Sequence, residues 1–120
     1  MAWSGKTAAT QLTSITTEQF FDTLVTLNPG ETADCEVEFN PPATPVDHLV
    51  VSVYGTLDAS TENWDDTAFL TFLISNSIDP NKRKFTVRDV YKFRVGVKRS
   101  GTTDTITSAD FAYRKNGVSL

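Results

Sequence analysis

The sequence contains one cysteine and one histidine among its 120 residues. The single cysteine, Cys35, excludes an intrachain disulfide and a zinc site built from several thiolates. The single histidine, His48, would have to serve any Ser–His–acid or Cys–His catalytic arrangement from within an apolar run. We therefore interpret His48 as a structural residue and Cys35 as a small buried apolar one.

Motifs that carry chemistry are also missing. There is no glycine-rich phosphate loop, no dinucleotide-binding signature, and no histidine or cysteine pair at metal-ligand spacing. We therefore expect a protein that is not an enzyme, with no cofactor, no metal and no catalytic residue.

No apolar run approaches the length of a membrane span, and the start, Met-Ala-Trp-Ser-Gly-Lys, lacks the apolar core of a signal peptide. We expect a soluble protein that does not contact a membrane and is made without Sec-dependent export. With 15 acidic and 11 basic residues the net charge is −4, which disfavours nucleic acid as a partner. The length of 120 residues fits one globular domain.

The sequence does contain repeated alternation of apolar and polar residues. Cys35, Val37 and Phe39 alternate with Glu36 and Glu38, which is typical of a half-exposed strand. The runs 46–58 and 67–75 are apolar on both faces and predict central strands, and further strands are expected near 83–90, 91–99 and 105–118. Short strands at this spacing predict an all-β protein, an antiparallel β-sandwich of the jelly-roll or immunoglobulin-like type.

Two segments are less regular. Residues 16–27 fit an amphipathic helix that Thr16 or Thr17 would cap, although a strand is favoured from Leu24 to Leu27. Residues 1–15 are rich in Thr, Ala and Ser and contain an isolated tryptophan, Trp3. We expect residues 1–15 to form an extended N-terminal arm and residues 16–120 to form the single sandwich domain.

An acidic loop surrounds a second tryptophan. Asp58, Glu62, Asp65 and Asp66 flank Trp64, so the loop from Asp58 to Asp66 offers oxygen ligands for calcium and an aromatic ring for a sugar. The interpretation that we favour is a connection without metal, whose tryptophan is structural or faces a partner.

The stretch YKFRVGVKR, residues 91–99, predicts a strand with two contrasting faces. Tyr91, Phe93, Val95 and Val97 would be buried, and Lys92, Arg94 and Lys98 would face outward. Eight of the eleven basic residues lie from position 82 to position 99, so a hairpin in this segment would make one sheet face positive. The candidate partner-binding residues are Trp3, Trp64, Lys92, Arg94 and Lys98, and a merely solvated surface is the alternative.

Two stretches of the chain resemble small β-sandwich structural proteins of tailed bacteriophages, particularly capsid decoration (cement) proteins. They are NPGETADCEVEFNPP and YGTLDASTENWDD, the second of which has a Gly-x-x-Asp turn before a tryptophan. The resemblance implies a non-enzymatic virion protein, assembled in the host cytoplasm, that bridges capsomers and stabilises the head. Its partners would be the major capsid protein or another virion protein and further copies of itself, as a dimer or trimer. A phage tail or neck component and a carbohydrate-binding β-sandwich module are the alternatives.

Overall fold

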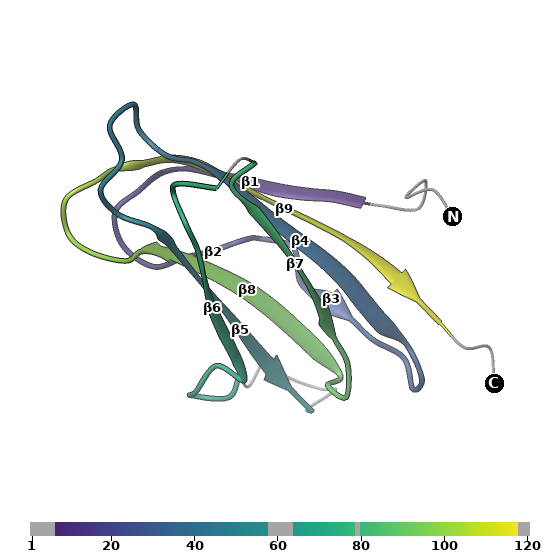
Figure 1. Cartoon of the computed structure of the whole chain (residues 1–120). Helices are drawn as coiled ribbons and strands as arrows, with labels where there is room; N and C mark the ends of the chain where they lie inside the picture. The colour runs from purple at the N-terminus through teal and green to yellow at the C-terminus, as the bar shows by residue number, and fades with distance from the viewer. Residues whose placement is uncertain (1–6, 58–63, 79, 118–120) are drawn as a thin grey trace.

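The computed structural model describes residues 7–57, 64–78 and 80–117 and shows two antiparallel β-sheets packed face to face (Figure 1). The four-stranded sheet has the order β1-β9-β4-β7, and the five-stranded sheet has the order β2-β8-β5-β6 with β3 also on β8. The strands are β1 (Thr7–Ile15), β2 (Gln19–Phe20), β3 (Val25–Thr26), β4 (Thr32–Asn40), β5 (Leu49–Thr56), β6 (Leu70–Ile74), β7 (Lys82–Val87), β8 (Lys92–Arg99) and β9 (Ile106–Asn116). The all-β sandwich prediction is confirmed.

The strand order identifies the type of sandwich. β2 and β3 are short segments that pair with different parts of β8, so they act as one interrupted strand. Counted in this way, the described residues form eight strands in the orders 1-8-3-6 and 2-7-4-5, which is the jelly-roll arrangement. The immunoglobulin-like alternative is therefore excluded.

The core lies between the two sheets. The inward side chains of β4, β5 and β8 alternate with outward ones, as the period of two predicts. Phe21 contacts Phe111 across the interior at 5.4 Å between ring centroids, and Phe72 contacts Phe85 at 5.2 Å. Phe93, Val95 and Val97 are fully buried, as predicted, whereas Tyr91 precedes β8 and is only half-buried.

The prediction of an arm over residues 1–15 is corrected for residues 7–15. These residues form β1 and pair with β9, from Thr7 opposite Tyr113 to Ile15 opposite Ile106. Ile15 is fully buried and Leu12 packs against the core. The described part of the sandwich thus begins at residue 7, and residues 1–6, including Trp3, lie outside the described residues.

Residues 16–27 contain β2 and β3 and no helix, so the helix alternative is wrong and the strand favoured over Leu24–Leu27 is confirmed by β3. A second segment differs from its prediction. β6 is an edge strand and not a central one, since it pairs only with β5. Its other side lies near β7, where the Arg83 guanidinium contacts the Phe72 ring at 5.0 Å and donates to the Leu73 carbonyl at 3.4 Å.

One end of the sandwich is closed by two buried carboxylates that bind backbone amides reciprocally. Oδ2 of Asp104 accepts hydrogen bonds from the amides of Val46 and Asp47, both at 2.7 Å. Oδ2 of Asp47 accepts from the amides of Thr103 and Asp104, at 3.0 and 2.8 Å. The segment before β5 is thereby tied to the turn between β8 and β9.

Candidate interaction surface

The outer face of the five-stranded sheet carries the basic residues that the sequence singled out. Lys92, Arg94 and Lys98 alternate with the buried residues of β8, so their side chains lie on the solvent side. The cross-strand partner of Arg94 is Tyr54 on β5, and the partner of Lys98 is Val50. The predicted orientation of these three cations is confirmed.

Arg94 lies among three aromatic rings. Its guanidinium carbon is 3.9 Å from the centroid of Phe20, 5.0 Å from that of Trp64 and 5.7 Å from that of Tyr54. Each separation is within the range of a cation–π interaction. The structure therefore brings together two of the predicted residues, Arg94 and Trp64, which are 30 positions apart in the sequence.

Gly96 makes room for this arrangement. Phe20 pairs with Gly96, and a Cβ atom at position 96 would lie 2.8 Å from Cε1 of Phe20. The Phe20 ring can thus lie across β8 and meet Tyr54 edge-on at 5.6 Å between centroids. Any larger side chain at position 96 would displace the ring that contacts Arg94.

One carboxylate, Glu18, lies beside this cluster. Its Oε2 atom is 3.5 Å from the Tyr54 hydroxyl, which donates the hydrogen bond. Partial burial, then the charge of Glu18 and this hydrogen bond raise the pKa of Tyr54, while Arg94 opposes the shift. The phenol therefore stays protonated at neutral pH and remains a donor to Glu18.

The two outer faces of the sandwich differ in their charge. On the four-stranded sheet, Lys82 approaches Glu36 at 3.6 Å and Arg114 approaches Asp34 at 3.7 Å. β7 and β8 belong to different sheets and do not form the expected basic hairpin. Lys82 and Lys84 of β7 instead lie opposite Glu38 and Glu36 of β4, whereas Arg83 pairs with Val37.

Some residues of this surface cannot be identified from the sequence. Phe20 lies in the segment 16–27, which fits a helix, and its contact with Arg94 depends on a pairing between distant strands. Tyr54 lies in a run that predicts a central strand, but no local signal indicates that it lies beside Arg94. Trp3 and residues 58–63 of the acidic loop lie outside the described residues.

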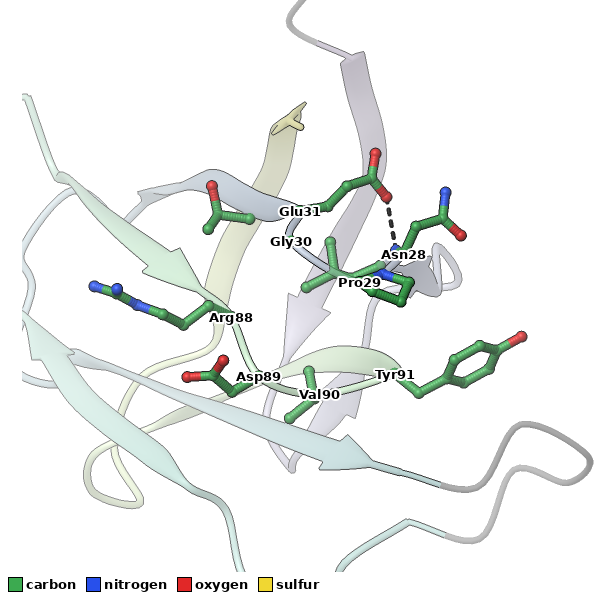
Figure 2. Close-up of a pocket in the computed structure, with 10 residues that line it drawn as sticks. Asn28, Pro29, Gly30, Glu31, Arg88, Asp89, Val90 and Tyr91 are labelled. Carbon is green, nitrogen blue, oxygen red and sulfur yellow. Dashed lines mark hydrogen bonds between the residues drawn. The ribbon is translucent and has the colours of Figure 1, made fainter. Parts of the chain in front are cut away.

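A separate pocket lies between the β3–β4 turn and the β7–β8 turn, and Figure 2 shows the residues that line it. Its volume is about 460 Å³. Gly30 has φ of 83°, which suits the third position of the turn that begins at Asn28. The Glu31 carboxylate turns back and accepts a hydrogen bond from the Asn28 amide at 2.7 Å, so it serves the turn itself.

The other candidate residues have structural surroundings. His48 accepts a hydrogen bond from the Asn76 amide at its Nδ1 atom, at 3.0 Å. In the described ranges no cluster of three or more His, Cys, Asp or Glu side chains has a geometry that could hold a metal ion. The same ranges contain no helix long and apolar enough to cross a membrane.

Cys35 is expected to resist thiol reagents in the native protein. It is 1% exposed, and burial together with the charge of Asp34 raises the pKa of its thiol from 9.0 to about 12. A bulky disulfide reagent at pH 8 should therefore label Cys35 only after denaturant is added. Rapid labelling of the native protein would contradict this.

The raised thiol pKa of Cys35 also makes the stability of the fold depend on pH. Because the thiol ionises more readily in the unfolded chain, the stability that the neutral thiol contributes is complete below pH 9 and is lost as the pH rises toward 12.

The observed architecture defines the chain as a jelly-roll β-sandwich with an arginine–aromatic cluster on one outer face. No protein-family model matches the sequence, and no curated protein matches it. Among solved structures, a similar fold occurs in a chain from work described as "Bacillus endospore appendages form a novel family of disulfide-linked pili". The TM-score is 0.56 with 16% sequence identity, over 95% of this chain and 86% of that chain, and this likeness establishes the fold alone.

Proposed function

We propose that this chain is a non-enzymatic structural protein of a virion, a capsid decoration protein that stabilises the phage head by bridging capsomers. The observation that carries the proposal is the outer face of the five-stranded sheet, where Lys92, Arg94 and Lys98 make no ion pair among the described residues, although Glu18 lies nearby. On the other sheet, Lys82 and Arg114 lie within 4 Å of carboxylates. A surface of this kind favours contact with a complementary neighbour.

The fold supports an assembly role. Jelly rolls are a common architecture of viral capsid proteins, although they also occur in lectins, so fold alone does not decide between these roles. A sugar ring would have to stack on an exposed face of an aromatic side chain. One face of the Trp64 ring is instead in contact with the Arg94 guanidinium. The surface therefore fits a protein partner better than a carbohydrate.

The partners that we propose are the major capsid protein or another virion protein, together with one or two further copies of the chain. The protein would be assembled in the host cytoplasm and would remain on the virion. A tail or neck component would use the same kind of surface at another place on the particle.

A second candidate is a subunit of a fibrous surface appendage. The observation that favours it is the fold likeness over nearly the whole of both chains to the appendage protein described as forming disulfide-linked pili. In this chain Cys35 is buried and its thiol pKa is raised to about 12. We therefore expect that Cys35 forms no disulfide bond between copies.

The experiment that separates the candidates is sedimentation velocity combined with negative-stain electron microscopy of the purified chain, with and without undecorated phage heads. Discrete dimers or trimers that attach to the heads and raise their resistance to heat would support decoration. Noncovalent fibres of the chain alone would support the appendage candidate. A monomer that forms no fibres and attaches to no particle would contradict both.

A further inference from the structure

The guanidinium of Arg94 is held in place before any partner binds. Phe20, Tyr54 and Trp64 contact it from different elements, namely β2, β5 and the segment that precedes β6. A long side chain normally loses rotamer freedom when it binds, and an arginine that is already stacked loses less. Arg94 is therefore suited to anchor an interface rather than to sit as one more solvated charge.

The hydrogen-bonding capacity of Arg94 is also incompletely used. Its Nε atom is buried and has no hydrogen-bond partner in the described part of the chain. Among the described residues, the terminal nitrogens of Arg94 make no hydrogen bond and no ion pair. The guanidinium contacts aromatic rings instead. An arginine in this state retains the planar pair of donors that matches a carboxylate in a two-point contact.

Two lysines extend the positive charge along β8. Lys98 is exposed, and the Lys92 ammonium lies 5.9 Å from the centroid of the Tyr91 ring. Lys92, Arg94, Lys98 and Glu18 together carry a charge of +2, so all the other residues together carry −6 within the total of −4. The positive face is thus a local exception on an acidic molecule.

From these observations we infer that the outer face of the five-stranded sheet binds a carboxylate-rich surface of a partner protein. Arg94 makes the two-point contact with one Asp or Glu side chain, and Lys92 and Lys98 attract the neighbouring carboxylates. The inference rests on the proposed function in taking this face as a docking surface, and it adds the chemistry of the partner.

The charge distribution favours a protein over a nucleic acid. An extended polyanion would meet three cations and then the acidic remainder of the molecule, which repels phosphates. A compact acidic patch on a folded protein can match the same three cations without reaching that remainder.

The test uses a fluorescently labelled oligo-glutamate peptide as the probe and fluorescence anisotropy at low and moderate salt. Arg94→Lys keeps the charge but removes the planar fork, and we expect it to weaken binding roughly tenfold. Lys98→Gln should weaken binding about threefold and reduce its salt dependence. Lys84→Gln, on the other outer face, is the matched control and should bind as wild type does.

Circular dichroism and a thermal melt identify any variant that fails to fold, and the exposed Lys98→Gln change keeps the test valid if Arg94→Lys is unstable. Binding by wild type that neither change weakens would overturn the inference, as would the absence of binding. Tighter binding of a single-stranded oligonucleotide of equal charge would assign the face to nucleic acid instead. Assembly into particles without oligo-glutamate binding would leave the proposed function in place and remove only this inference.

Discussion

Replacing Phe93 by alanine is expected to lower the free energy of unfolding by about 3–5 kcal/mol. Phe93 is fully buried at the start of β8, where it pairs with both Gly55 on β5 and Val25 on β3. The change removes the apolar contacts of the ring and leaves a cavity that the surrounding sheets can fill only in part. Since domains of this size are stable by about 5–15 kcal/mol, we expect a large loss of folded protein.

Urea unfolding followed by circular dichroism measures this effect, with Leu73→Ala as the control. Leu73 also lies in a strand of the same sheet but is 44% exposed, so its truncation should cost less than about 1 kcal/mol. If Phe93→Ala were no more destabilising than Leu73→Ala, the assignment of the two faces of the sheet would be wrong.

Replacing Asp104 by alanine is expected to destabilise the protein on the order of 2–6 kcal/mol. The change removes the acceptor for two amides, those of Val46 and Asp47, and each buried donor left without a partner costs about 1–3 kcal/mol. It also leaves the Asp47 carboxylate, without the reciprocal bonds of Asp104, to tie the turn before β9 to the segment before β5. Hydrogen exchange should show faster exchange at these two amides together with a lower melting temperature.

Asp104→Asn is the matched control, because its amide oxygen can still accept both hydrogen bonds. We expect the asparagine variant to lose less stability than the alanine variant and to keep slow exchange at Val46 and Asp47. Equal losses in the two variants would mean that the charge, and not the acceptor geometry, holds this end of the sandwich together.

Alternation within single strands could be predicted from the sequence. The pattern Cys35, Val37, Phe39 marks the inward face of β4, and Phe93, Val95 and Val97 mark that of β8. Both strands contain β-branched and aromatic residues at a period of two, and the burial of one face follows from that period alone. The outward direction of Arg94 could be predicted for the same reason.

Strand position in the sheet could not be predicted in this way. β1 contains few large apolar residues, and it is a strand because β9 offers it a continuous partner from Tyr113 to Ile106. β6 is as apolar as a central strand because Phe72 packs on Phe85 of the opposite sheet, not because it has two neighbours. Both outcomes depend on contacts between residues that are distant in the sequence.

The arginine–aromatic cluster was missed for the same physical reason. Arg94 and Trp64 are separate candidates in the sequence, but Phe20 contacts Arg94 only because β2 pairs with β8 at Gly96. The charges of β7 show the converse case. They are concentrated near those of β8 in the sequence, yet β7 crosses to the other sheet and lies opposite the carboxylates of β4.

The most direct test of the central claim asks which outer face becomes covered on assembly. Lys98→Cys places a surface thiol for a nitroxide label on the five-stranded sheet, and Thr13→Cys places one on the four-stranded sheet. Cys35 is buried and stays unlabelled in both variants. Electron paramagnetic resonance spectra compare the label mobility in dispersed subunits and in assembled particles. We predict that the label at position 98 is immobilised on assembly while the label at position 13 stays mobile. A label at position 98 that remains as mobile in the particle as in the free subunit would contradict the account.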